Sequence, residues 1–295
     1  HTRYWRDWSS DVCSSDLRSA TSGERGLAAP EDAFELDAES PALGTREAFL
    51  AWRPEAAAGV TDVHSPLLEA AALYRDLLEF HADDRDPTAL LAADLDRILW
   101  AAGAAVGPEV AERRQAALEA FIERAGDHET TALARFHLAQ AVREAGDLVE
   151  ARAIALVAAE AHPQSPGGVM CRNLVTEIEA PDLSLVTERA WAAPWPVVRV
   201  TYRNLDTIHL RLAAADVDAR LRAGKPHGAW LDDADRDAIL ALPAVKAHTV
   251  ALPATADYLH RHHDVPVANA FDAATLAPGA YWVIASHREI GRAHV

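Results

Sequence analysis

The sequence predicts an α+β protein of more than one domain, in which a stack of helical hairpins precedes an antiparallel β-sandwich. Two observations carry this prediction. Apolar residues recur at helical spacing, between regularly placed prolines, over residues 45–180. From Leu183 onward apolar and polar residues alternate, which is the pattern of strands with one face in water. The change follows the turn-forming stretch PQSPGG, so we expect domains at residues 45–180 and 181–288.

The two ends of the chain are related through the antisense strand. Written as the codons GAG ATC GGA AGA GCA CAC GTC, residues Glu289 to Val295 have a reverse complement that encodes Asp11 to Leu17. A match of this length indicates a translated sequencing adapter rather than natural protein sequence. We therefore expect residues 1–17 and 289–295 to be adapter-derived, and the natural part to be an internal piece of a longer gene.

The natural part opens with a segment of low aromatic content. Residues 18–44 are rich in Ala, Glu, Ser, Gly and Pro. A segment of this composition buries little apolar surface, and it predicts a flexible lead-in to the helical region.

Three helix starts follow, each marked by a proline. Ser65-Pro66 and Asp86-Pro87 place a capping side chain before a proline at the first helical position, and Pro108 begins a third helix. The sequence therefore predicts helices over residues 66–81, 87–103 and 108–125, with apolar stripes formed by Leu68, Ala72, Leu77 and Phe80, by Leu91, Leu95, Ile98 and Ala102, and by Val110, Leu118, Phe121 and Ile122.

The most patterned helical stretch runs from Thr130 to Pro163 and is 34 residues long. Small residues such as Ala139 and Ala151 permit close helix packing, Gly146 interrupts the chain between two helices, and the closing proline ends the second helix. This length and pattern are typical of a tetratricopeptide repeat (TPR). Because such a repeat needs neighbours to bury its faces, we expect the preceding helices to complete a short TPR-like stack.

The strand pattern is clearest after residue 196. Val198, Val200 and Tyr202 alternate with polar residues, and so do Ile208, Leu210 and Leu212. Further strands are predicted in the stretches LSLVTERA, VKAHTVALP, DYLHRHHDVPV and AYWVIAS, and a short helix is predicted over Asp232 to Leu242. Antiparallel strands spaced in this way predict a β-sandwich over residues 181–288.

The net charge, the cysteine count and the apolar runs of the sequence limit its possible partners and surroundings. The formal net charge is −17, which argues against binding to nucleic acid. One of the two cysteines, Cys13, lies in the predicted adapter, so Cys171 has no disulfide partner within the natural part and leaves the redox compartment open. No apolar run approaches the length of a membrane span.

Two polar clusters suggest metal binding. His260, His262 and His263, followed by Asp264, supply zinc-type ligands, and a strand would place the first two on one face. No further ligand cluster has suitable spacing, so a solvent-exposed role is favoured. The acidic run Asp232, Asp233, Asp235 and Asp237 lacks the glycine and the closing glutamate of a calcium loop, and it is better explained as a charged helix start.

The remaining candidates favour structural roles. Ser165 and Ser184 lack the setting of a catalytic nucleophile. Cys171 is better explained as a buried thiol at a helix start, and Trp191, Trp195 and Trp230 as side chains that cover a sandwich edge. The sequence contains no phosphate-binding or dinucleotide-binding motif. It therefore predicts no catalytic, cofactor-binding or metal-binding residue, and we expect a protein that is not an enzyme.

The order of residues around the domain junction resembles the N-terminal region of large bacterial alpha-2-macroglobulin family proteins. In that family a helical segment ends in a P-x-S-x-G-x-x-C-x-x-L stretch, and a first macroglobulin sandwich begins with a P-x-L…V-x-Y-R-N-L pattern. The stretches LPATADYLHRH and LAPGAYWVIAS resemble later strands of that sandwich. The match is carried by Pro163, Ser165, Gly167 or Gly168, Cys171, Leu174, Pro181, Leu183, Tyr202, Asn204 and Leu205.

The resemblance implies a protein that inhibits proteases by entrapment. In the family, cleavage of a bait segment makes a multidomain chain collapse around the protease, and many members then bind it through a Cys–Gln thioester. The sequence has no C-x-E-Q motif, so no functional residue carries over. What is implied is a scaffold, a helical stack and a macroglobulin-like sandwich. The partners implied are proteases, bound through other parts of a longer chain, and envelope proteins, in the bacterial periplasm or cell envelope.

Two other hypotheses remain open. The first is a TPR-like interaction module, with a groove for a peptide, fused to an unrelated β-sandwich. The second is a metal-dependent enzyme built on the histidine cluster, which ranks last. Further sandwiches in the gene would favour the inhibitor, and stoichiometric zinc would favour the enzyme.

Overall fold

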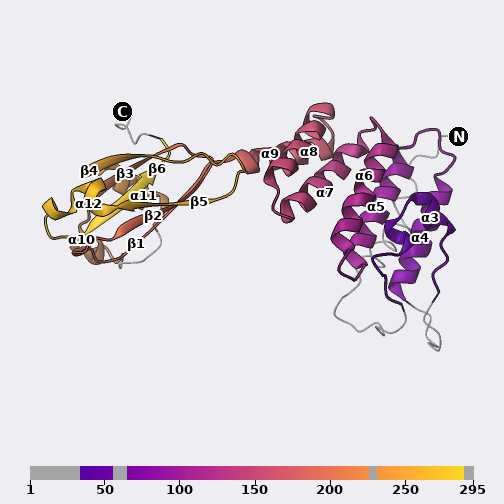
Figure 1. Ribbon diagram of the computed structural model, residues 1–295, viewed down its shortest axis with the longest axis horizontal. Coiled ribbons are helices and arrows are strands. Elements are labelled where there is room, and N and C mark those ends of the chain that lie inside the picture. The colour runs from indigo at the N-terminus through magenta and orange to yellow at the C-terminus, as the bar shows by residue number, and fades with distance from the viewer. Residues whose placement is uncertain (1–33, 56–64, 226–230, 289–295) are drawn as a thin grey trace. The chain divides into compact units, whose positions relative to one another are not determined.

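The computed structural model describes residues 34–55, 65–225 and 231–288, so the predicted adapter segments and Trp230 lie outside the described residues. The chain divides into two compact units, His1–Val175 and Thr176–Val295. Helices come first and two small antiparallel sheets follow (Figure 1), so the protein is a mixed α+β protein, as the sequence predicts.

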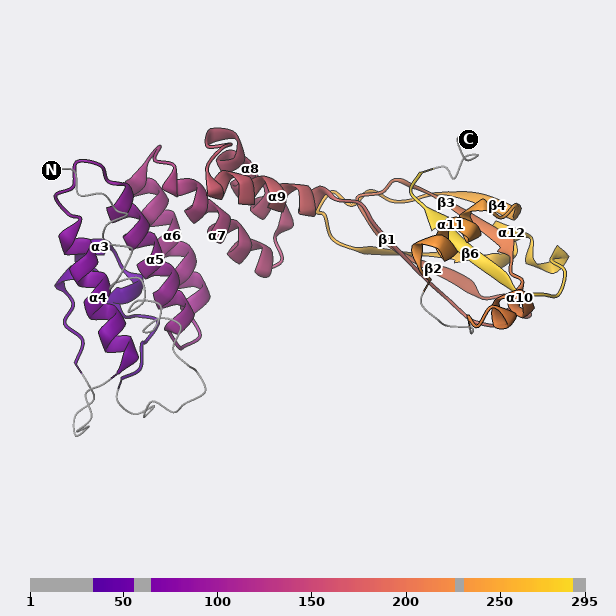
Figure 2. The same ribbon diagram turned by 180° about the vertical axis from the view of Figure 1, so that it is seen from behind.

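Helices make up the described part of the first unit. Each helix from α4 to α7 packs against the one after it, and α5 also contacts α7. Figure 2 shows α4, α5 and α6 side by side, as Figure 1 does from the opposite side. The elements are η1 (Pro41–Leu43), α3 (Arg46–Ala51), α4 (Pro66–Phe80), α5 (Thr88–Ala104), α6 (Val110–Ala125), α7 (Thr130–Glu144), α8 (Leu148–Ala161) and α9 (Pro166–Glu179), the last of which ends beyond the unit boundary.

The described part of the predicted lead-in, residues 34–44, is packed rather than flexible. Leu36, Ala42 and Leu43 are buried in the same hydrophobic cluster as α4 and α5. Backbone bonds between this segment and Val106 add a short parallel bridge. The low aromatic content concealed this packing because two leucines, Leu36 and Leu43, supply most of the buried apolar surface.

The helix starts agree with the prediction in position but not always in chemistry. Asp86 caps as expected, since its Oδ1 accepts hydrogen bonds from the backbone N–H and the hydroxyl of Thr88. Ser65 makes no side-chain cap, and it is instead buried at the start of α4. Gly146 takes a φ of 95° between α7 and α8, a conformation that favours glycine.

The buried faces of α5 and α6 largely agree with the prediction, and that of α4 differs from it in part. In α5 and α6 the predicted residues Leu91, Leu95, Ile98, Leu118, Phe121 and Ile122 are buried together. The predicted stripe of α4 is only partly right, because Ala72 is exposed and Leu77 is half-buried against the core. The buried side chains of this helix are Ala70, Ala71, Tyr74 and Leu78. Alanines and a tyrosine occupy this face since α4 lies close against α5, with the Tyr74 ring 5.2 Å from that of Trp100.

The second unit contains two three-stranded antiparallel sheets, with strand orders β1-β2-β5 and β4-β3-β6. In the first sheet Ser184 pairs with Thr201, and Thr201 pairs with His262. In the second, His209 pairs with both Thr249 and Ser286. The strands are β1 (Asp182–Thr187), β2 (Val197–Arg203), β3 (Thr207–Ala214), β4 (Ala244–Ala251), β5 (Arg261–Pro266) and β6 (Tyr281–Ser286).

One hydrophobic cluster draws side chains from both sheets. The alternation seen in the sequence decides which ones, because every second residue of β2 and β3 points to the same side. Those residues are Val198, Val200 and Tyr202 from β2 and Ile208, Leu210 and Leu212 from β3, all nearly or fully buried. Short helices complete the unit, namely α10 (Val217–Arg222), α11 (Asp233–Ala241), α12 (Val267–Phe271) and η2 (Ala273–Thr275).

Candidate functional site

The histidine cluster lies on the outer face of the sheet β1-β2-β5. His262 is the register partner of Thr201, a neighbour of the buried Val200 that points to the opposite side. The Nε2 atom of His260 lies 2.8 Å from Asp182 Oδ2 on β1, which places His260 on this outer face as well. His263 pairs with Val200 and so belongs to the other face. The structure thus separates the three histidines that the sequence groups.

Hydrogen bonds connect the outer-face side chains across the strands. His262 Nδ1 lies 2.9 Å from the Thr201 hydroxyl, and Arg199 makes a two-point ion pair with Asp264, with Nε to Oδ1 at 2.9 Å and Nη2 to Oδ2 at 3.1 Å. The hydrogen bond from His260 lowers the pKa of the Asp182 carboxyl, and those from Arg199 lower the pKa of Asp264. Within the described ranges no group of three or more His, Cys, Asp or Glu is arranged to hold a metal ion.

The acidic run after residue 231 begins a helix. Asp232 caps α11 by accepting from the backbone N–H of Asp235. Asp235 is itself buried, and it accepts hydrogen bonds from Lys225 at 2.8 Å and from Arg220 at 3.3 Å. These hydrogen bonds, that of Lys225 foremost, lower the pKa of Asp235. The interpretation as a charged helix start accounts for this run, and Asp235 additionally ties α10 to α11.

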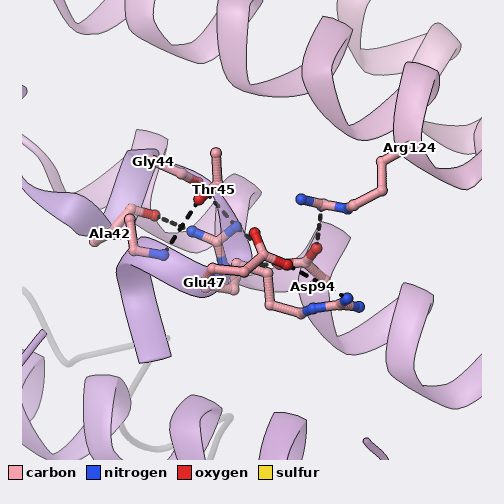
Figure 3. A network of polar contacts seen from close by, with 9 residues as sticks. Ala42, Gly44, Thr45, Glu47, Asp94 and Arg124 are labelled. Carbon is pink, nitrogen blue, oxygen red and sulfur yellow. Dashed lines mark hydrogen bonds and ion pairs between the residues drawn. The ribbon is translucent and has the colours of Figure 1, made fainter. Parts of the chain in front are cut away.

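A buried ionic network, which sequence reasoning missed, lies in the first unit (Figure 3). Arg97 and Asp94 are both fully buried, and Arg97 donates through Nε and Nη2 to Asp94 Oδ1. Arg97 also donates to the carbonyl oxygens of Ala42 and Gly44, and Arg124 donates to Asp94 Oδ2. A signal was present, since Asp94 and Arg97 interrupt the apolar face of α5 three residues apart.

The function of this network is structural. Burial lowers the pKa of Arg97, because the charged form is displaced from water, while the adjacent Asp94 acts in the opposite direction. The guanidinium also lies over the Phe49 ring, 5.0 Å from its centroid. The bonds from Arg97 to Ala42 and Gly44 fasten the segment before α3 to α5. The contact with Phe49 joins α3 to α5, and the bond from Arg124 to Asp94 joins α6 to α5.

The Ser165 and Cys171 region is a packing motif. Ser165 Oγ accepts from the backbone N–H of Gly168, which caps α9. A Cβ on Gly168 would lie 1.9 Å from His162 O, and one on Gly167 would lie 2.2 Å from Leu133 N, so both glycines are required by close backbone approach. Cys171 is fully buried and its Sγ lies 3.5 Å from Ala132 O.

This environment disfavours the reactive thiolate form of Cys171. Burial raises the pKa of the Cys171 thiol to about 11, so that the thiol is protonated at neutral pH. The other serine candidate, Ser184, lies exposed on β1 with Thr201 as its register partner. The three residues therefore have different settings. Ser165 caps α9, Cys171 is buried within that helix, and Ser184 is exposed on β1.

Two of the three candidate tryptophans, Trp191 and Trp195, pack on the core of the second unit. The Trp191 ring stacks on that of Phe271 with centroids 6.2 Å apart, and Trp195 packs against the same hydrophobic cluster. The third candidate, Trp230, lies outside the described residues.

The motif residues at the start of the second unit form a polar junction. Asn204, with a positive φ of 55°, donates from Nδ2 to Ile178 O at 2.7 Å and to Ala180 O at 3.1 Å. Its backbone N–H donates to the buried hydroxyl of Thr255. The Tyr202 hydroxyl donates to Pro253 O at 2.9 Å. Two separate sequence stretches are thereby attached to the turn between β2 and β3.

No family model, no curated protein and no solved structure matches the chain. None of the helices in the described part of the chain is both long and apolar enough to cross a bilayer.

Proposed function

We propose that residues 34–288 are a non-catalytic scaffold from the N-terminal part of a bacterial alpha-2-macroglobulin-like protease inhibitor. In this proposal a TPR-like helical stack leads into a first macroglobulin-like sandwich. The proteases are held by other parts of the longer chain, which would be exported to the periplasm or cell envelope.

The proposal is supported by the structural contacts that the motif residues make. Ser165, Gly168, Cys171, Tyr202 and Asn204, which carry the resemblance, are all engaged in caps, close backbone contacts or buried hydrogen bonds. Residues that only fasten backbone segments to one another are what a scaffold requires. A catalytic site would instead hold reactive groups near a space for substrate.

The packing of α7, α8 and α9 supports the helical part of the proposal. α7 and α8 form an antiparallel pair within the 34-residue stretch, and the start of α9 approaches the backbone of α7 at Ala132 and Leu133. In a helical-hairpin stack the first helix of each repeat packs on the first helix of the preceding one. α5 and α7 have the same relationship.

The complete gene tests the proposal. We expect the reading frame in the source DNA to continue past Arg288 into successive antiparallel sandwich domains. A gene that ends soon after residue 288 would contradict the inhibitor and favour the interaction module.

The complete protein then allows a functional test with trypsin. An entrapped protease keeps its active site but excludes large substrates. We therefore expect trypsin to lose activity on a protein substrate and to keep it on a small chromogenic peptide. The 295-residue chain alone, as the matched control, should leave both activities unchanged. Loss of both activities would indicate direct blocking of the active site, and loss of neither would reject inhibition.

One observation favours the second candidate, a TPR-like interaction module joined to an unrelated sandwich. Val149 and Val157 on α8 and Val169 and Met170 on α9 are exposed apolar side chains. Exposed apolar groups on neighbouring helices are a common feature of peptide-binding surfaces. Under this hypothesis the double substitution V149S/V157S abolishes peptide capture and leaves the far-ultraviolet circular dichroism unchanged, whereas the inhibitor proposal expects no captured peptide.

A further inference from the structure

Two histidines stand side by side on the outer face of the sheet β1-β2-β5. His260 immediately precedes β5 and His262 lies within it, with one residue between them. Extended backbone advances about 3.3 Å per residue, which would place their Cα atoms about 6.6 Å apart. His260 is 46% exposed at its side chain, and His262 is also exposed. Both rings can therefore be reached from solvent.

Each ring has one nitrogen engaged and the other left for a ligand. Asp182 is a carboxylate that accepts from Nε2 of His260, so the neutral ring carries its lone pair on Nδ1. Thr201 engages Nδ1 of His262, which leaves Nε2. A carboxylate or hydroxyl behind an imidazole fixes the ring orientation and raises its basicity as a metal ligand.

We infer that His260 and His262 form a two-imidazole chelate for a divalent transition-metal ion. Asp182 and Thr201 orient the two rings, and water fills the remaining positions of the ion. Metal–imidazole bonds of about 2.1 Å require the two ligating nitrogens to lie about 3–4 Å apart. Binding therefore requires the two exposed rings to approach one another while they keep their hydrogen bonds to Asp182 and Thr201. This site differs from a three-ligand catalytic centre, for which the described residues offer no suitable group.

Copper is the appropriate probe, because Cu²⁺ has the highest affinity among the divalent first-row ions for nitrogen ligands. The full 295-residue chain, freed of metal with a chelator, is titrated with Cu²⁺ by isothermal titration calorimetry. Electron paramagnetic resonance then reports the nitrogen ligands. The chain contains 14 histidines, and others among them can also bind Cu²⁺. The site is therefore identified by the difference in bound Cu²⁺ between variants.

The decisive variant is H260N/H262N, and H209N/H248N is the matched control. The control also removes two histidines, from β3 and β4 of the other sheet. We expect the first variant to lose one Cu²⁺ equivalent and the control to keep it. Equal binding by the two double variants would overturn the inference.

The single variant D182N tests whether Asp182 orients His260, because it leaves both imidazole ligands in place. It retains both imidazoles and replaces the carboxylate acceptor with an amide. Loss of an outer-shell partner typically weakens metal affinity about 10-fold or more, so we expect the same stoichiometry with a dissociation constant raised by about this factor. Unchanged affinity in D182N would exclude the arrangement proposed for His260.

Discussion

The side-chain amide of Asn204 donates to the carbonyl oxygen of Ile178 at 2.7 Å, and so connects the turn after β2 to the last turn of α9. The last carbonyl groups of a helix lack partners within the helix, and an amide donor satisfies them. Asn204 can do this because asparagine tolerates the positive φ of 55° that the turn requires.

Asn204→Asp should destabilise the second unit. The substitution keeps the shape of the side chain but removes both N–H donors, and it faces a carboxylate toward two carbonyl oxygens. The expected cost is about 1–3 kcal/mol, as for a buried acceptor left unsatisfied. Faster hydrogen exchange of the β2 and β3 amides would report it. Asn204→Gly keeps the backbone conformation and loses the amide without adding a carboxylate. A comparison of the two variants therefore separates the loss of the donors from the repulsion between the carboxylate and the carbonyl oxygens.

Arg97→Met should destabilise the first unit strongly. Asp94 is fully buried, and removal of Arg97 deprives it of two hydrogen bonds. Breaking a buried ion pair costs about 3–5 kcal/mol. Arg199→Met, which breaks the exposed pair with Asp264, is the matched control and should cost at most about 1 kcal/mol. Urea titration of both variants tests the contrast, and equal losses would refute the structural role of the buried network.

Gly168→Ala should prevent the normal packing of α9. The new Cβ would lie 1.9 Å from a backbone oxygen, which has no side-chain freedom to move aside. Overpacking of this kind costs about 1–3 kcal/mol or more. At Gly103, in α5, a Cβ would meet no described atom within 4 Å, so Gly103→Ala should stabilise the helix by about 0.5–1 kcal/mol. Thermal melting of the two variants should shift in opposite directions.

Cys171 should resist thiol reagents in the folded protein. Its pKa of about 11 and its burial keep the reactive thiolate scarce at pH 8. In a Cys13→Ser background, which leaves Cys171 as the only thiol, Ellman's reagent should react slowly until urea unfolds the first unit. Rapid reaction of the native protein would show that α9 does not stay packed on α7.

The second unit should lose stability in acid, in part through Asp235. Its pKa is lowered in the folded state, chiefly by the hydrogen bond from Lys225. The stabilising contribution is therefore complete above the unfolded value of about 3.9, and it disappears as the pH falls through the folded value. Asp235→Asn should flatten the pH dependence of unfolding below about pH 4. An identical acid limb in the variant would show that other carboxylates dominate.

The sequence predicted elements well where local chemistry decides them. Prolines and capping residues placed the starts of α4, α5 and α6 within two residues, and alternation placed β2 and β3. These signals are local in the sequence, so they do not depend on contacts with distant segments.

What the sequence could not reveal depends on contacts between distant segments. No role for Arg97 was predicted from the sequence, because its acceptors at Ala42 and Gly44 lie more than fifty residues away. The packing of residues 34–44 depends on the same contacts. Of the histidine cluster, His262 and His263 lie on β5 as predicted, but His260 precedes that strand. The division of the cluster between two faces and its partner Asp182 required the register of three strands.

The position of β5 at the edge of its sheet has a consequence for solubility. An edge strand offers unpaired backbone groups to any other extended chain, and uniform apolar edges promote fibril growth. β5 carries Arg261, His262, His263 and Asp264 in succession. A second strand added at this edge would have to bring its own side chains against charged and imidazole groups. His262, which we propose as a metal ligand, thus also helps to keep neighbouring molecules from joining their sheets.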